Sequence, residues 1–287
     1  MKFFLILFIF LYSLNADIKI LDTYELKSKD IHELSALAYD GKTLYALSDY
    51  GVLHHFKLKI KNNKIKIIKP IKSYKLKNKN YIRLKKKKRD SEGLVYLNNK
   101  LYISFERKPR VEQYSLNGIK IKKIKIPKIL RDIKNYKSKN KALESLAYSD
   151  KYGFITAPEE PFKDKNIHKL YTTKNKIFSF KASGLITDIV FIDTDNILVL
   201  QRDWCSLKFK LTITLTKVNL ANCNQNMCQS EILRTLTNHK DNFIDNYEGL
   251  TKIDKNLFLM VSDDNNNILQ KTYFMLFSHG KSRLRAF

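Results

Sequence analysis

Carboxylate side chains stand at both ends of short hairpins in this chain. In RDSEGLVYLNNKLYISFERKP, residues 89–109, Glu92 precedes a first apolar run and Glu106 follows a second. Asn98 and Asn99 join the two runs, an arrangement typical of a β-hairpin. Because a hairpin brings its two ends together, both carboxylates are expected at the same end. Several such pairs around one axis would offer the oxygen ligands that a hard cation binds.

This hairpin occurs five times. The copies span residues 34–49, 91–106, 143–159, 186–203 and 247–264. Their aligned first positions are Ser35, Glu92, Glu144, Thr187 and Glu248, at spacings of 57, 52, 43 and 61 residues. Such a period matches the four-stranded blade of a β-propeller better than the shorter repeat of a solenoid.

The sequence therefore predicts an all-β fold, a β-propeller of four-stranded blades. The count is five blades, and a sixth, degenerate blade within the longer spacings is the alternative. A third and usually a fourth apolar run follow each hairpin, but the last unit ends after its third. Residues 18–26, IKILDTYEL, are predicted to supply the missing strand. That pairing would close the ring through the two termini and remove an exposed sheet edge.

The N-terminus indicates export. Residues 1–16, MKFFLILFIFLYSLNA, combine a lysine, a short apolar run and a small-residue end, which predicts a signal peptide cleaved near Ala16. A retained N-terminal anchor is the alternative. Residues 17–287 are then a single domain, periplasmic or extracellular, with no further run long enough to span a membrane. No pattern indicates an oligomer, so a monomer is expected.

The chain is strongly basic, with a formal net charge of +26. A basic chain invites a nucleic-acid interpretation. The lysines, however, are spread along the whole sequence, and an exported protein rarely meets nucleic acid. The expected partner is therefore an anionic small molecule or a phosphorylated component of the cell envelope.

Three cysteines bear on the compartment. Cys223 and Cys228 are close enough in sequence to form a disulfide in an oxidising environment, which would leave Cys205 free. Pairing of Cys205 with either of the others is the alternative. Three scattered thiols without a fourth nearby ligand do not indicate a zinc site.

The repeated acids define the candidate site. In a propeller the first strands line the central channel, so Glu92, Glu144 and Glu248 are expected around the axis. Acids at the ends of second strands, which include Asp49 and Asp263, are expected to form an outer ring on the same face. Converging carboxylates suit Ca²⁺. The predicted metal ligands are Glu92, Glu144, Glu248, Asp263 and Asp49.

The same residues suggest chemistry. A bound metal polarises an ester oxygen and activates water. Glu92, Glu144 and Glu248 are predicted to act as metal ligands or general base, and Arg202 is predicted to hold the anionic group of the substrate. Two basic runs, residues 83–90 and 134–141, precede inner glutamates and would favour an anionic ligand. The alternatives are that each acid caps a turn or pairs with a lysine, and that the basic runs are solvated loops.

These motifs resemble the phytase-like family of secreted β-propellers, described as having the esterase-like activity of phytase. The resembling segments include DSEGLVYLNNKLYISFER, ALESLAY and DNYEGLTKIDKNLFLMVSDDNNN, within residues 33–267. The resemblance implies a calcium-binding propeller with its site at the axial mouth. It places Glu92, Glu144, Glu248 and Asp263 in that site, with Asp49 and Arg202 as lesser members. The first and fourth copies depart from it, with Ser35 and Thr187 in place of an acid.

Two functions follow as hypotheses. The first is a calcium-dependent hydrolase of phosphate or carboxylic esters acting at the axial mouth. The second is a non-catalytic binding propeller of the cell envelope, in which structural calcium or lysine–carboxylate bridges hold the blades together. A catalytic metal ion needs an open coordination position, and a metal ion that only bridges blades does not. A test for metal-dependent activity therefore distinguishes the two hypotheses.

Overall fold

The computed structural model describes residues 18–162, 166–241, 243–267 and 270–280. The predicted signal peptide, residues 1–16, lies outside the described residues. Within them the chain is all-β, with strands and four short 3-10 turns and no α-helix. No helix in these ranges is long and apolar enough to cross a membrane.

The strands of the described residues form three four-stranded sheets and one eight-stranded sheet. The eight-stranded sheet consists of two groups of four strands, joined by one parallel bridge between Ser179 and Met227. We describe these two groups separately, so that the sheets are treated as five units of four strands. Unit I contains β2 (Leu34–Tyr39), β3 (Thr43–Ser48), β4 (Val52–Lys61) and β5 (Lys64–Lys75). Unit II contains β6 (Ser91–Leu97), β7 (Lys100–Phe105), β8 (Arg110–Tyr114) and β9 (Lys120–Ile124). Unit III contains β10 (Ala147–Ser149), β11 (Gly153–Thr156), β12 (Ile167–Thr172) and β13 (Ile177–Lys181). Unit IV contains β14 (Leu185–Phe191), β15 (Asn196–Cys205), β16 (Lys210–Asn224) and β17 (Met227–Thr237).

Unit V is built from both ends of the chain. It contains β18 (Asn246–Asp254), β19 (Leu257–Asp263), β20 (Tyr273–His279) and β1 (Ile18–Glu25). β1 pairs antiparallel with β20, from Ile18 opposite His279 to Glu25 opposite Tyr273. This is the pairing that the sequence predicts for residues 18–26.

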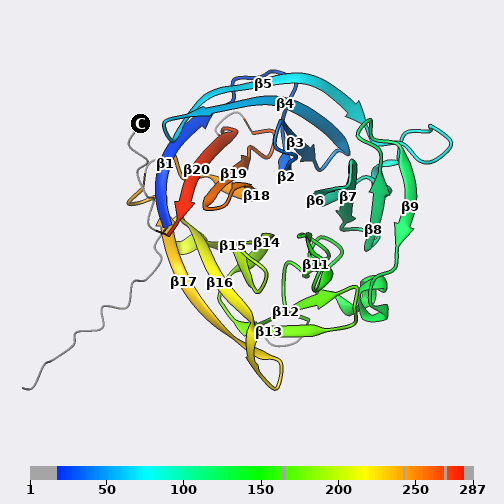
Figure 1. Ribbon diagram of the computed structural model, residues 1–287, viewed down its shortest axis with the longest axis vertical. Helices are drawn as coiled ribbons and strands as arrows, with labels where there is room; N and C mark the ends of the chain where they lie inside the picture. The colour runs from blue at the N-terminus through cyan, green and yellow to red at the C-terminus, as the bar shows by residue number, and fades with distance from the viewer. Residues whose placement is uncertain (1–17, 163–165, 242, 268–269, 281–287) are drawn as a thin grey trace, which may run out of the picture.

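The units are arranged around a central axis, with each first strand innermost (Figure 1). β2 contacts β6, β6 contacts β10, β10 contacts β14, β14 contacts β18, and β18 contacts β2. Apolar side chains fill the space between neighbouring units. One cluster joins Leu200 and Leu215 of unit IV to Phe258 and Met260 of unit V. Because a sheet in this position is covered on both faces, its inner strands are continuous apolar runs rather than alternating ones.

Two glycines explain the Glu-Gly-Leu sequence at the start of β6 and β18. A Cβ added at Gly93 would lie 2.6 Å from the backbone nitrogen of Leu146 in unit III. A Cβ at Gly249 would lie 2.9 Å from the Cα of Ala36 in unit I. A side chain at either position would therefore collide with the backbone of the next unit, and only glycine allows this close packing.

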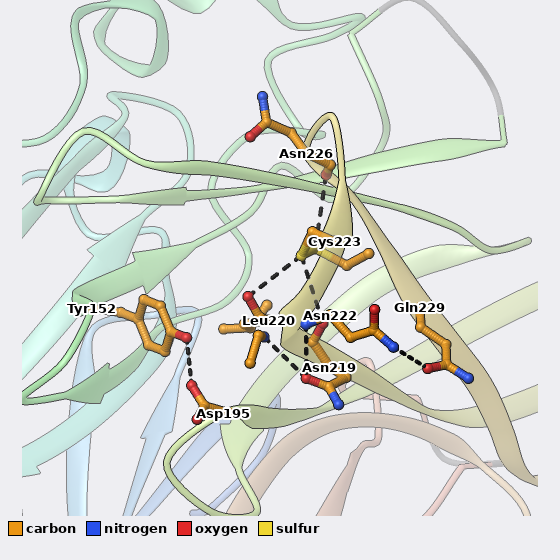
Figure 2. The surroundings of a disulfide bond; sticks show 10 residues. Tyr152, Asp195, Asn219, Leu220, Asn222, Cys223, Asn226 and Gln229 are labelled. Atoms are coloured by element: carbon orange, nitrogen blue, oxygen red, sulfur yellow. Dashed lines mark hydrogen bonds between the residues drawn. A yellow bond between two sulfur atoms is a disulfide. The ribbon is translucent and has the colours of Figure 1, made fainter.

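The outer hairpin of unit IV carries the disulfide. Cys223 and Cys228 are bonded across β16 and β17, which confirms the first of the predicted pairings, and Cys205 is free. Close to the bond, the Asn222 side chain donates to Gln229 Oε1 at 2.8 Å (Figure 2). The tip of this hairpin continues onto unit III, where Ser179 N donates to the carbonyl oxygen of Asn226 at 2.7 Å. The contact covers part of the outer edge of β13, which would otherwise be exposed.

A buried aspartate links three of the inner strands. Asp188 is 1% exposed, and its carboxylate accepts hydrogen bonds from the backbone nitrogens of Ile189 and Leu250, both at 2.8 Å. The backbone nitrogen of Leu146 also bonds to it. One side chain thus joins units III, IV and V near the axis.

We expect Asp188→Asn to lower the free energy of unfolding by about 1–3 kcal/mol, because the amide nitrogen cannot accept a bond from a backbone N–H. Urea denaturation of wild type and variant measures the difference. Asp30→Asn, at an exposed aspartate, is the control. A change at Asp188 no larger than the control's, within about 0.5 kcal/mol, would contradict this role.

Candidate functional site

Among the described residues, carboxylates gather at the starting end of the inner strands, and we name seven of them the acidic mouth. Its members are Asp49, Glu92, Glu106, Glu144, Glu159, Glu248 and Asp263. Glu92 lies at its centre, where the charges of Asp49, Glu144, Glu106 and Glu248 all act on its carboxyl group. The five predicted metal ligands therefore lie together, but so do Glu106 and Glu159, which the ligand prediction left out.

Local bulges position the first-strand residues. The ladder between first and second strands is interrupted between Ser91 and Leu94, and again between Tyr247 and Gly249. Glu92 and Glu248 fall in these interruptions, so their side chains are not held in the regular alternation. Such bulges commonly re-aim a side chain at a functional site.

Unit III opens further and brings three glutamates together. Its regular hairpin begins only at β10, and one isolated bridge joins Leu143 to Pro158 before it. Glu159 N then donates to the carbonyl oxygen of Ala142 at 2.9 Å, and Ala142 N donates to Glu106 Oε1 at 3.4 Å. As a result, one carboxylate oxygen from each of Glu106, Glu144 and Glu159 lies within 4.8 Å of the others.

Two cations enter the acidic mouth. Arg202 Nη1 lies 2.6 Å from Glu248 Oε1, and its Nη2 lies 3.2 Å from Glu159 Oε1. Its Nη1 also donates to the side-chain oxygen of Asn246. Lys141 Nζ lies 2.8 Å from Glu159 Oε2. Neither cation pairs with Glu92 or Glu144, and the described residues supply no other ion pair to these two glutamates.

Burial and crowding oppose ionisation of most of these acids. Burial, followed by the charges of nearby acids, raises the pKa of Glu106 to about 8. Burial and the charge of Glu248 raise the pKa of Asp263 to about 8. Burial and neighbouring acids likewise hold the pKa of Glu92 and of Glu144 well above the usual range. A bound cation would relieve this repulsion.

Arg202 is held in its charged state. Burial alone would lower the pKa of its guanidinium, but the carboxylates of Glu248 and Glu159 raise it overall. The predicted role for this residue was to hold a substrate anion. The structure instead places it between two carboxylates of the protein, with its side chain 25% exposed.

Neighbouring Asp264 has a separate, structural role. Its carboxylate accepts hydrogen bonds from Glu33 N at 3.0 Å and from the Thr272 hydroxyl at 2.9 Å. It also forms a hydrogen bond with His32 Nδ1 at 2.8 Å. Burial opposes ionisation of Asp264, yet these hydrogen bonds keep its pKa below the usual value. Asp264 therefore ties the end of β19 to the segment before β2, and it is saturated without a metal.

The two basic runs differ in what they contribute. In residues 134–141, Lys141 reaches Glu159, and Lys137 Nζ lies 3.0 Å from Glu160 Oε2. In residues 83–90, the three lysines of the 3-10 turn η1 (Lys86–Lys88) are exposed. The run at 134–141 thus helps to neutralise the acidic mouth, as the lysine–carboxylate alternative predicted.

The donor set of the acidic mouth fits a hard cation. Its seven members offer carboxylate oxygens, and Glu106, Glu144 and Glu159 are close enough to share one ion. Ca²⁺ prefers oxygen ligands in a flexible arrangement, whereas structural zinc sites use histidine and cysteine. The group that could hold calcium therefore shares only Glu144 with the predicted ligand set.

Comparison with known proteins identifies the relationship. Residues 29–266 match the model of the phytase-like family, described as "Esterase-like activity of phytase". The chain belongs to the phytase-like family. The matched range includes every member of the acidic mouth, together with Arg202 and Lys141, and confirms the resemblance drawn from the sequence. A search of curated proteins found no match to the phytase-like chain.

Among solved structures, the phytase-like chain is similar to a putative oxidoreductase (glucose dehydrogenase) from Thermus thermophilus. The TM-score is 0.47 at 8% sequence identity, over 89% of this chain and 99% of that one. A likeness this distant says nothing about activity.

Proposed function

We propose that the five units are the blades of one closed propeller, and that the acidic mouth is a calcium-dependent site for hydrolysis of phosphate or carboxylic esters. The family match supports ester chemistry. The observation that carries the proposal is the convergence of Glu106, Glu144 and Glu159 beside the unpaired Glu92. The sequence resembles secreted members of this family, so the proposal includes export of the chain by its predicted leader.

The residues have distinct roles in this proposal. Glu106, Glu144 and Glu159 would hold the ion, which supplies Lewis acidity and lowers the pKa of a bound water. Glu92 is 7% exposed, and burial raises the pKa of its carboxyl group, so in this proposal it would serve as the acid or base that transfers a proton. Arg202 would orient an anionic substrate, because its guanidinium could exchange the carboxylate of Glu248 for an anionic group of the substrate. Asp49 and Asp263 complete the carboxylate wall.

The test is hydrolysis by the exported chain, residues 17–287. We expect p-nitrophenyl phosphate or p-nitrophenyl acetate to be cleaved in millimolar calcium and not in EDTA. Glu92→Gln should lower the rate by about 100-fold or more, the usual contribution of acid–base catalysis. Glu112→Gln is the matched control, because Glu112 is similarly buried but pairs with Arg110 and Lys120 away from the mouth. Equal rates in calcium and EDTA would contradict calcium dependence.

The second candidate is a non-catalytic binding propeller. The ion pairs of Arg202 with Glu159 and Glu248 support it, because one cation of unit IV lies between acids of units III and V. In that case neither ester would be cleaved, and calcium would change stability alone.

A further inference from the structure

A second opening lies at the opposite end of the inner strands. A cavity of about 700 Å³ is lined there by residues of all five first strands and by the turns that follow β10 and β14. About four residues of strand, roughly 13 Å, separate this end from the acidic mouth. Asp188 lies next to this cavity, because Leu146, Ile189 and Leu250, whose backbone nitrogens bond to it, line the cavity.

The same position of the hairpin repeat faces this cavity in every unit. It lies four residues after the aligned first position of each hairpin, which is Ser35, Glu92, Glu144, Thr187 or Glu248, and it is half-buried in all five cases. Its occupants are Tyr39, Tyr96, Tyr148, Phe191 and Lys252. Four aromatic rings and one ammonium group therefore surround one opening, which we name the aromatic mouth.

Other aromatic side chains stack on two of these rings, Tyr96 and Phe191. Tyr45 stacks on Tyr96, with ring centroids 5.8 Å apart and planes within 8°. Tyr152 stacks on Phe191 at 6.2 Å and 6°. Tyr152 is itself fixed, because its hydroxyl donates to Asp195 at 2.6 Å (Figure 2). Stacking of this kind holds a ring in place at the wall of the cavity.

The charges around the aromatic mouth balance. Its lining includes two acidic residues, Asp150 and Asp193, and two basic residues, Lys151 and Lys252. Lys151 pairs with Asp195 at 2.6 Å, and Lys252 Nζ donates to the carbonyl oxygen of Ile192 at 2.5 Å. This balance gives no advantage to an ionic ligand of either sign.

We propose that the aromatic mouth binds a neutral carbohydrate. The C–H faces of a sugar ring pack on fixed aromatic rings, while its hydroxyl groups bond to carboxylates and ammonium groups at the rim. The cavity volume lies within the range of about 300–1,000 Å³ that is usual for ligand sites. This site shares no residue with the acidic mouth, so it stands whether or not the proposed ester chemistry is right.

Saturation-transfer NMR on residues 17–287 tests the proposal, with chitotetraose, maltotetraose and cellotetraose as probes. We expect saturation transfer to at least one of them. Tyr96→Ala and Phe191→Ala should each weaken binding by about 3- to 10-fold, the equivalent of one aromatic contact. Tyr81 is 70% exposed and lies outside the cavity, so Tyr81→Ala should bind the sugar as wild type does. Glu144→Gln, at the acidic mouth, should also bind the sugar as wild type does.

Circular dichroism establishes that each variant is folded, and Tyr96→Phe, which keeps the ring, should retain binding. Three results would overturn the proposal. The first is the absence of saturation transfer to any of the three sugars. The second is saturation transfer that persists in both alanine variants. The third is saturation transfer to choline but to no sugar, which would indicate a cation-binding cage instead.

Discussion

Millimolar calcium is expected to raise the midpoint of thermal unfolding by roughly 5–10 °C over the value in EDTA. Calcium at about 100 times its dissociation constant adds about 2.7 kcal/mol to stability, and a domain of this size gains roughly 2–4 °C per kcal/mol. The physical cause is the acidic mouth, where Glu106, Glu144 and Glu159 crowd together and burial raises the pKa of Glu106 to about 8. A differential scanning calorimeter measures both midpoints.

The variants locate the effect. Glu144→Gln/Glu159→Gln should lose the calcium gain, because it removes two of the three converging carboxylates. Glu112→Gln removes a buried carboxylate elsewhere and should keep the gain, even if its midpoint in EDTA falls. A calcium gain that persists in the double variant would place the ion outside this group.

Arg202→Met is expected to lower the free energy of unfolding in EDTA by about 3–5 kcal/mol, the usual result of removing one partner of a buried ion pair. Methionine fills much of the space of the arginine side chain but leaves Glu159, which is 1% exposed, and Glu248 without this cation. The remaining carboxylates would then repel one another more strongly. Urea denaturation of wild type and variant measures the loss.

Lys217→Met provides the matched control. Lys217 Nζ lies 2.7 Å from Glu231 Oε2, but that carboxylate is 38% exposed. The loss should therefore be about 0–1 kcal/mol. If Arg202→Met costs no more than Lys217→Met, Arg202 does not hold the acidic mouth together.

The features that depend on local sequence were predicted well. Each hairpin of the repeat lies where its apolar runs and turns indicated, since strand period and turn chemistry are local properties. The pairing of residues 18–26 with the last strand followed from a missing fourth strand. The disulfide between Cys223 and Cys228 followed from their short separation.

The detailed site depends on contacts between units, which a repeat alignment does not contain. Glu106 joins Glu144 and Glu159 because unit III opens at Leu143 and Pro158 and brings Ala142 against the end of unit II. Proline beside the two acids of Pro158–Glu160 was the available signal for an irregular strand end. Nothing in the sequence indicated that Arg202 would pair with acids of two other units.

The departures from the repeat also have a structural explanation. Ser35 stands where an acid was expected, and its hydroxyl donates to the carbonyl oxygen of Ser91 at 2.9 Å. The Thr187 hydroxyl donates to the carbonyl oxygen of Tyr247 at 3.3 Å. Both side chains therefore link their unit to the next one, and the carboxylates concentrate on units II, III and V.

A crystal structure of residues 17–287 grown in calcium, with anomalous data collected at long wavelength, would show directly whether the acidic mouth holds the ion. We expect an anomalous peak between the carboxylates of Glu106, Glu144 and Glu159, with oxygen ligands at about 2.3–2.6 Å. A well-ordered acidic mouth in millimolar calcium with no peak there, and with Arg202 and Lys141 still paired to Glu159, would contradict it.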